Sequence, residues 1–516
     1  MLWEKISSTR KGRYALIFVF VLLFLVTRLP RLHNDVINPD GANWHYRSQQ
    51  FINGLKYQQF EKTYQHYHPG VILMWATGVP VEVTKQLTPE KSYDVSNFQL
   101  FHFVAKFGLV FVQLGLTLAA VYVFSQIFGF RKSLLIAGLF SLEPFFVGNS
   151  RLYHMDILFT LLLFISLGLS YLYIKKGGGW RGVFSGLFLA FSFLTKSVGI
   201  GALLFVLLAI VLFFREHRSW KRVLSQLGVV LGSFVVFTFM FFPALWAAPL
   251  HYLVEIFSEA ERVGIRKGHG QILFGEYTRN GGLLFYPLVT ALKVSPFLLF
   301  GLGVYVFSLF KGRVRFKEFG KFKKFKLSFS PELFLTVFYL GYMLVMLVSS
   351  KKLDRYLLVI YPLLSLLSLQ GYVWLKDRFK AWGWVSGIFG LVFLVYPLVS
   401  FFPYYFTYFS PVFGTAKNAH SVLAQKPFGV GVYELQELIY ERYGRDVSMG
   451  FVDVKPMESI HANSKVFNIR EYGASNYDIL VLAVNEEIPD NLIDVFVQDE
   501  VLEINGLDYW RIYVKK

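Results

Sequence analysis

Long apolar runs recur along the chain and are separated by short polar segments. A helix needs about 20 apolar residues to cross the hydrocarbon core of a bilayer, which is roughly 30 Å thick. Most of the runs approach this length, so the pattern predicts an all-α polytopic membrane protein. About eleven transmembrane helices are expected, near residues 13–29, 101–125, 133–149, 155–174, 181–196, 198–214, 223–247, 286–310, 331–349, 356–375 and 382–402.

Two parts of this pattern allow more than one interpretation. The segment 69–87 is apolar but carries two charges. If it crossed the membrane, the basic loop 311–326 would face outward, against the tendency of Lys and Arg to remain in the cytoplasm. We therefore expect 69–87 to be a half-embedded, interfacial helix. Residues 181–214 can also form one long kinked helix, although Thr195-Lys196-Ser197 favours an external turn between two spans.

Basic residues gather in every second short loop, which sets the expected orientation. These loops are the N-terminal segment and residues 131–132, 175–181, 215–222, 311–326 and 376–380. The positive-inside rule places them in the cytoplasm, and an odd number of spans then places the C-terminus outside. This distribution accounts for much of the net charge of +18 and argues against a nucleic-acid partner. The chain has no cysteine, which excludes disulfides and thiolate metal sites.

The composition changes after residue 402. Residues 1–402 hold all the predicted spans and a long outer loop, 30–100, whereas 403–516 are more polar. The tail has a helical pattern at 430–443, and its β-rich runs are Val447–Val452, Ser464–Ile469, Asp478–Val484 and Leu507–Val514. We expect a membrane module, 1–402, followed by a small α/β extracytoplasmic domain, 403–516.

Asp40 is the first candidate for chemistry. It lies a few residues beyond the first span, in a polar and aromatic part of the outer loop. A carboxylate at this level can take a proton from an acceptor while a lipid-borne substrate lies in the bilayer beside it. We therefore expect Asp40 to act as a general base. The alternative is a helix N-cap, because Pro39-Asp40-Gly41 also suits a helix start, and both roles can hold together.

Arg151 and Asp156 lie at the outer end of a predicted span. Charges this close to lipid are costly unless they are paired or solvated in a cavity. We expect Arg151 to bind a phosphate, with Asp156 orienting it or capping the span. The alternative is a structural ion pair between buried groups.

Lys351, Lys352 and Arg355 form an outer basic cluster, where the charge rule disfavours cations. An anionic ligand explains their presence, with Arg355 gripping a phosphate bidentately and the lysines acting as point charges. Snorkelling to lipid headgroups is the alternative. Lys196, in another external turn, adds to the same cationic surface.

His66, Tyr67 and His68 lie in the outer loop just before the interfacial segment. We expect them to line the sugar or phosphate end of a pocket. A His-x-His pair can also bind a metal, but no metal site is predicted here, and a divalent cation remains open as a cofactor.

The order of these motifs resembles a known family, and the resemblance runs over most of residues 14–420. The motifs are Asp40, His68-Pro69, Arg151 with Asp156, Phe193 to Lys196, Lys293 to Phe297, Lys351 to Tyr356, and Pro403 to Gly414. They resemble the GT-C glycosyltransferases of the protein O-mannosyltransferase group (glycosyltransferase family 39) and the related aminoarabinose transferases of lipid A. Gly41 stands where the family commonly has a second acid, and Ser410-Pro411 replaces the usual Asn-Pro.

The resemblance implies transfer of a sugar from a polyprenyl- or dolichyl-phosphate donor to an acceptor hydroxyl, with inversion at the anomeric carbon. By position, Asp40 matches the family's catalytic acid and Arg151 the arginine near the donor phosphate. The later basic residues match the cluster that faces the lipid phosphate. The segment 311–330 is too short for the β-trefoil insert of eukaryotic relatives, which indicates a prokaryotic enzyme of the plasma membrane.

The expected function is therefore a membrane glycosyltransferase that works on the outer face. Its partners would be membrane lipids, the lipid-phosphate sugar and an acceptor that is a protein, a lipid or a glycan. The alternative is a transporter or flippase for lipid-linked sugars, because charges near spans also mark transport paths. The charges gather at the outer rim and not at mid-span, which favours the transferase.

Overall fold

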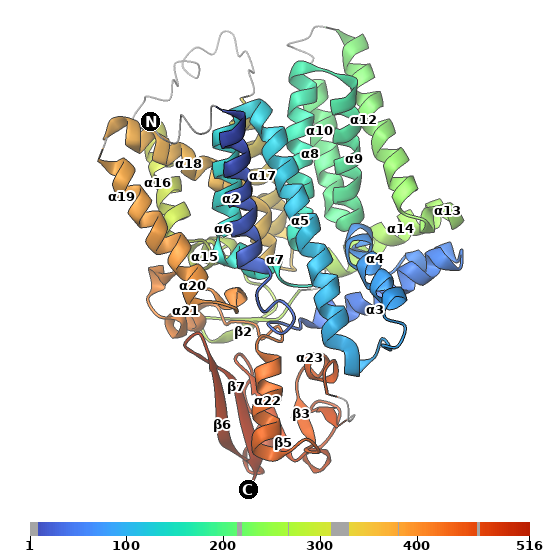
Figure 1. Ribbon diagram of the computed structural model, residues 1–516, viewed down its shortest axis with the longest axis vertical. Coiled ribbons are helices and arrows are strands. Elements are labelled where there is room, and N and C mark those ends of the chain that lie inside the picture. The colour runs from blue at the N-terminus through green and yellow to red at the C-terminus, as the bar shows by residue number, and fades with distance from the viewer. Residues whose placement is uncertain (1–8, 214–218, 267, 311–329, 380, 462–464) are drawn as a thin grey trace.

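The computed structural model describes residues 9–213, 219–266, 268–310, 330–379, 381–461 and 465–516. It shows a bundle of long helices with a small sheet domain at one end (Figure 1). The N-terminal side of the chain lies at the far end of the bundle from the C-terminus. The predicted basic segment 311–326 lies outside the described residues.

Six helical segments among the described residues are long and apolar enough to cross a membrane. They are Val95–Phe128 (with α5, Phe98–Phe128), Asp156–Lys176 (α8), Trp220–Phe241 (α12), Pro331–Val348 (α17), Asp354–Arg378 (η6, Asp354–Ile360, and α18, Tyr361–Arg378) and Gly383–Ser400 (α19, Trp382–Gly390, and α20, Tyr396–Ser400). Other predicted ranges hold α2 (Arg10–Arg28), α9 (Gly179–Thr195) and α10 (Ile200–Leu212). The polytopic helical fold is confirmed, while the number of eleven spans stays a prediction.

Two predicted single spans, 133–149 and 286–310, are wrong as continuous helices. The first divides into α6 (Phe130–Leu142) and α7 (Pro144–Ser150), bent by 75°, and the second into α15 (Phe285–Lys293) and α16 (Pro296–Phe310), bent by 118°. Proline has no backbone N–H and is favoured at the first position of a helix, so each proline starts a new helix. The two break points contact each other, because the Glu143 carboxylate accepts a hydrogen bond from the Ser295 backbone N–H at 3.0 Å.

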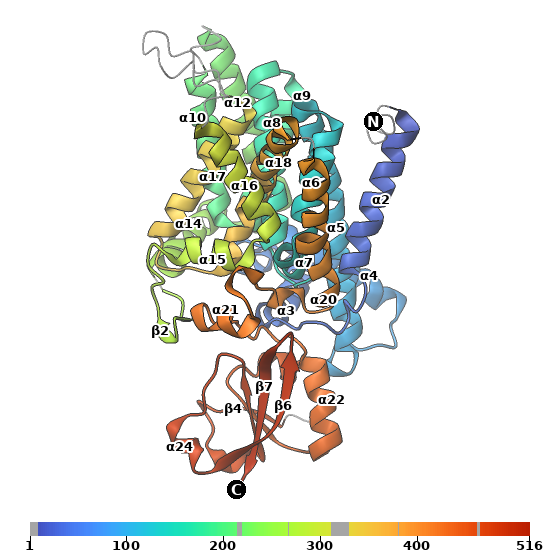
Figure 2. The same cartoon turned by 90° about the vertical axis from the view of Figure 1, so that its left-hand side faces the viewer.

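Short helices lie across the end of the bundle, between it and the sheet domain (Figure 2). They include α3 (Pro39–Lys56), α14 (Pro249–Glu259) and α21 (Ala416–Val422), with α4 (Val71–Leu87) beside α3 (Figure 1). The helix expected at 69–87 is therefore present, at the end of the bundle nearer the C-terminus. Smaller elements of this layer are α13 (Ala244–Ala247), β1 (Gln271–Leu273) and β2 (Glu276–Thr278).

The tail forms a five-stranded sheet in the order β4-β3-β5-β7-β6. The strands are β3 (Met449–Phe451), β4 (Val466–Asn468), β5 (Ile479–Ala483), β6 (Phe496–Ile504) and β7 (Leu507–Lys515). Helix α22 (Val432–Tyr443) and four strands occupy the predicted ranges, with α23 (Lys455–Glu458) and α24 (Asp490–Ile493) between strands. Strand β6 was not predicted from the sequence. It is an edge strand, and its acidic residues hide the alternation of apolar and polar positions and suit an exposed edge.

The segment that leads into α3 is tied to the tail. The Ile37 backbone N–H donates to the Gly429 carbonyl at 3.2 Å, and Val36 forms an antiparallel bridge with Val430. Arg31 forms an ion pair with Glu434 of α22. The start of α3 is thus held between the bundle and the sheet domain.

Candidate active site

Asp40 is the second residue of α3, at the end of the bundle that faces the tail. Pro39 starts this helix and Asn38 is its N-cap residue, so the N-cap interpretation of Asp40 is wrong. The positive end of the helix dipole favours a carboxylate in the first turn. The Asp40 side chain is 40% exposed, which leaves the carboxylate accessible to a substrate.

The Asp40 carboxylate meets groups from two other parts of the chain. Arg355, in η6, donates through Nη2 to Asp40 Oδ2 at 3.0 Å, and His154 Nε2 lies 3.4 Å from the same oxygen. Both residues also contact Asp156. His154 Nδ1 lies 2.8 Å and Arg355 Nε lies 3.3 Å from Asp156 Oδ2. Lys196 forms an ion pair with the second oxygen of Asp156. Residues 315 positions apart in sequence therefore share one site.

The environment of Asp40 keeps its carboxyl group ionised. Burial opposes the charge, but the neighbouring Arg355 and His154 outweigh it and hold the pKa of Asp40 below its usual range. At neutral pH the carboxylate is therefore a hydrogen-bond acceptor for a hydroxyl.

The predicted pocket residues of the outer loop lie next to this cluster. Lys351 donates to the Tyr67 hydroxyl at 3.1 Å, and His68 Nδ1 lies 3.2 Å from Ser197 Oγ, beside Lys196. The Trp44 and His66 rings make an edge contact at 6.0 Å. Burial, together with nearby Arg47, lowers the pKa of His66 to about 4, so its imidazole is neutral at pH 7.

Lys352 does not join the cluster. Its ammonium donates to the Ser349 carbonyl at 2.6 Å, and the residue is buried. Neighbouring residues of one turn point in different directions. Lys351 and Arg355 therefore reach the site, whereas Lys352 does not.

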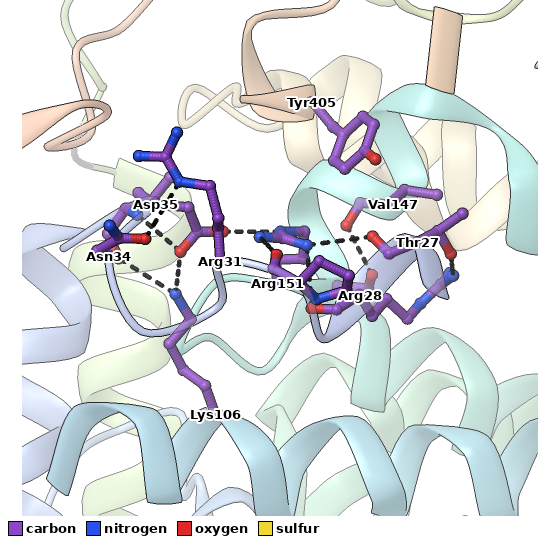
Figure 3. Close-up of polar contacts among 12 residues, drawn as sticks. Thr27, Arg28, Arg31, Asn34, Asp35, Lys106, Val147, Arg151 and Tyr405 are labelled. Carbon is purple, nitrogen blue, oxygen red and sulfur yellow. Dashed lines mark hydrogen bonds and ion pairs between the residues drawn. The ribbon is translucent and has the colours of Figure 1, made fainter. Parts of the chain in front are cut away.

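Arg151 lies in a second network, which Figure 3 shows. Its Nε donates to Asp35 Oδ2 at 2.7 Å, and its other nitrogens donate to the carbonyls of Thr27, Arg28 and Pro30. Lys106, from α5, donates to the other oxygen of Asp35 at 2.5 Å. Four protein groups thus accept hydrogen bonds from Arg151, and its ion-pair partner is Asp35 and not Asp156. Phosphate binding by Arg151 stays a prediction.

We expect Arg151→Met to destabilise the protein by about 3–5 kcal/mol, because it removes one of the two cations that pair with the buried Asp35 carboxylate and leaves three carbonyls without their side-chain donor. Thermal unfolding of the purified protein in detergent measures the loss. Lys417→Met is the control, because the Lys417–Asp508 ion pair is exposed and such pairs contribute about 0–1 kcal/mol. Equal stability of the two variants would contradict the structural role.

An apolar groove begins at this site. One cavity of about 270 Å³ is lined by polar and charged side chains, among them His68, Lys196 and Glu261, and by Tyr342, Tyr356 and smaller apolar side chains. A second, of about 290 Å³, lies between α8, α10 and α17 and shares Val198, Tyr342 and Val345 with the first. The groove therefore runs from charged groups at the end of the bundle to a lining of Phe, Leu, Val and Gly.

Among the described residues, no group of three or more His, Asp or Glu side chains is placed to hold a metal ion. His66 and His68 contact each other, with the His68 backbone N–H donating to His66 Nδ1 at 3.1 Å. A divalent cation stays an open expectation, without a ligand set in this part of the chain.

His154 is a residue of the cluster to which the sequence assigned no role. It lies between Asp40 and Asp156 and contacts both. Its position two residues before Asp156, in the segment already chosen for its charges, was the available signal. Arg47 lies seven residues after Asp40 in α3 and also acts electrostatically on Asp40 and His66.

Part of the chain matches a known protein family. Residues 98–243 match the family described as dolichyl-phosphate-mannose-protein mannosyltransferase. No protein of curated function matches the whole sequence at a significant level.

Solved structures share the fold over nearly the full length. ArnT from Cupriavidus metallidurans bound to undecaprenyl phosphate superposes with a TM-score of 0.55 at 13% identity, covering 96% of this chain and 97% of that one. Its apo form gives a TM-score of 0.51 at 14% identity, covering 97% and 98%. The predicted GT-C architecture is confirmed by this likeness. The chain thus has the fold of the GT-C structures, and its segment 98–243 is similar to the mannosyltransferase family.

Proposed function

We propose that this enzyme transfers a sugar from a polyprenyl- or dolichyl-phosphate donor to an acceptor hydroxyl at the outer membrane surface, with inversion. One observation carries the proposal. Lys196, which pairs with Asp156 beside Arg355 and Asp40, also lines an apolar groove between α10 and α17. A ligand that fits both the charged cluster and the groove has a charged head and a long hydrocarbon chain. ArnT, which has the same fold, binds undecaprenyl phosphate, which supports this class of donor.

The residues have distinct roles in the proposed reaction. The acceptor oxygen attacks the anomeric carbon, and the bond between that carbon and the phosphate oxygen breaks, with its electron pair passing to the phosphate. Asp40 orients the hydroxyl and accepts its proton. Arg355, Lys196 and Lys351 stabilise the charge that develops on the leaving phosphate. Attack from the side opposite the phosphate inverts the anomeric carbon.

The proposed orientation follows from the distribution of charge. The N-terminus would lie in the cytoplasm, and residues 403–516 would form an extracytoplasmic domain next to the active site. The fold is consistent with this, since the N-terminal side and the sheet domain lie at opposite ends of the bundle (Figure 1). The membrane module would comprise residues 1–402.

Mass spectrometry of products tests the proposal. The purified full chain is incubated with a panel of polyprenyl-phosphate sugars and with protein, lipid and glycan acceptors. A sugar covalently attached to an acceptor, with release of polyprenyl phosphate, is the expected result. Movement of labelled lipid-linked sugar across vesicles without any covalent product would favour a flippase and contradict the proposal.

We expect Gly201→Leu to raise the KM for a long-chain donor several-fold, because this glycine lines the groove and a new side chain would fill it. Donors with a short, water-soluble lipid should be affected much less. Gly228→Leu on α12 is the control, since its Cβ position is also open but it does not line the groove. Unchanged KM for the long-chain donor in Gly201→Leu would place the lipid elsewhere.

A further inference from the structure

Lys426 lies in the tail, in a segment that contacts Arg355 of the active site. Its position is set by anchored neighbours. Gln425 accepts a hydrogen bond from Lys293 at 3.0 Å, and the Lys426 carbonyl accepts one from the Tyr509 hydroxyl at 3.0 Å. Two residues later, the Phe428 ring packs against the Arg355 guanidinium, with 5.1 Å between the guanidinium carbon and the ring centre. The segment that carries Lys426 therefore lies over Arg355.

The ammonium of Lys426 has no partner in the described part of the chain. Its nitrogen is shielded from solvent and forms no hydrogen bond, although its charge is costly to bury. Burial lowers its pKa to about 8, and the charged groups that act on it most are Asp354, Arg355, Asp40 and Lys351. Arg355 Nη1 also lacks a hydrogen-bond partner. Two buried cationic donors beside Asp40 are thus left unsatisfied.

Charge balance points to an anion as the missing partner. Lys196, Lys351, Arg355 and Lys426 surround this site, and three carboxylates accompany them: Asp40, Asp156 and Asp354. Arg47 also acts on Asp40, so the cations near this site outnumber these carboxylates until an anion binds. A buried donor that is unsatisfied in a folded protein requires an explanation, and a bound ligand supplies one.

We infer that Lys426 is a phosphate-binding residue contributed by the tail, which contacts the donor phosphate together with Arg355. The inference rests on the proposed function and adds the C-terminal segment to the donor site. When the bond from the anomeric carbon to the phosphate oxygen breaks, a phosphodiester with one negative charge becomes a phosphomonoester with two. The proton of the acceptor hydroxyl goes to Asp40. A cation placed at the phosphate therefore favours the leaving group more than the intact donor.

The test compares Lys426→Met with wild type and with Lys426→Arg, in the purified full chain. Binding of polyprenyl phosphate alone, without sugar or acceptor, is titrated in detergent, and kcat is measured with the active donor. We expect Lys426→Met to weaken binding of polyprenyl phosphate by on the order of 10-fold or more and to lower kcat, since hydrogen bonds to charged groups are stronger than those between neutral groups. The effect on affinity for the sugar-bearing diester should be smaller. Lys426→Arg should recover most of both losses.

A second neutral variant, Lys426→Gln, and thermal unfolding separate binding from folding. Loss of an unpartnered charge should leave the unfolding temperature unchanged or higher. Lys417→Met, an exposed lysine of the same tail, is the matched control. If both neutral variants bind polyprenyl phosphate as tightly as wild type, the inference is overturned. If wild type itself neither binds polyprenyl phosphate nor transfers sugar, the proposed function fails instead.

Discussion

Asp40→Asn is expected to lower the rate of sugar transfer by a factor on the order of 10²–10⁴, the usual contribution of a general base. Asn keeps the size of the side chain and can still accept a hydrogen bond from Arg355, but it cannot take the proton of the acceptor. The donor phosphate should bind at least as well as before, because a carboxylate beside it has been removed. The loss should therefore fall on kcat and not on the KM for the donor.

The measurement is product formation by the purified enzyme, with unfolding temperature as a check on folding. Glu90→Gln is the matched control, because Glu90 is an exposed acid of the same outer loop. It should retain wild-type kcat. Full activity of Asp40→Asn would reject Asp40 as the base, and a lower unfolding temperature with unchanged kcat per folded molecule would assign it a purely structural role.

Arg355→Gln is expected to weaken donor binding and to lower kcat by on the order of 10²–10³, the loss typical of a group that stabilises developing charge. It should also change the pH profile. In wild type, Arg355 and His154 hold the pKa of Asp40 below its usual range, so the carboxylate stays ionised and active as the pH falls to about 4. Without Arg355 this pKa rises, and the acidic limb of kcat/KM should move to higher pH.

The shift is tested by measuring kcat/KM between about pH 3 and 7, which covers ordinary carboxyl titration, at those pH values where the protein stays folded. Arg442→Gln provides the control, since Arg442 lies on the tail surface, 58% exposed. It should leave both kcat and the acidic limb unchanged. If Arg355→Gln loses activity but its acidic limb stays in place, then Arg355 does not set the protonation of the catalytic group.

The convergence of Asp40, Asp156, Lys196 and Arg355 could be predicted because topology alone brings them together. Each lies at a span end on the same side, and the positive-inside rule sorts those ends from sequence. These side chains can then meet only at the end of the bundle that the rule assigns to the outer side. Their order along the chain also carried the family resemblance, which the matching segment and the shared fold bear out.

The placement of individual side chains could not be predicted in the same way. Arg151 stands four residues from the span that Asp156 opens, yet it pairs with Asp35, because α7 turns by 75° from α6 and faces the start of the outer loop. That bend depends on tertiary packing as well as on Pro144. Lys426 carried no signal at all, since a single lysine in a polar tail becomes unusual only when burial removes its solvent.

The tie between residues 36–37 and 429–430 has a consequence for how the enzyme is made. A ribosome produces these two segments far apart in time, with nearly the whole membrane bundle synthesised between them. The entrance to α3 reaches its final form only after residues 429–430 have been made and have folded against it. A chain that ends before these residues would therefore lack the contact that fixes the start of α3, and with it the position of Asp40.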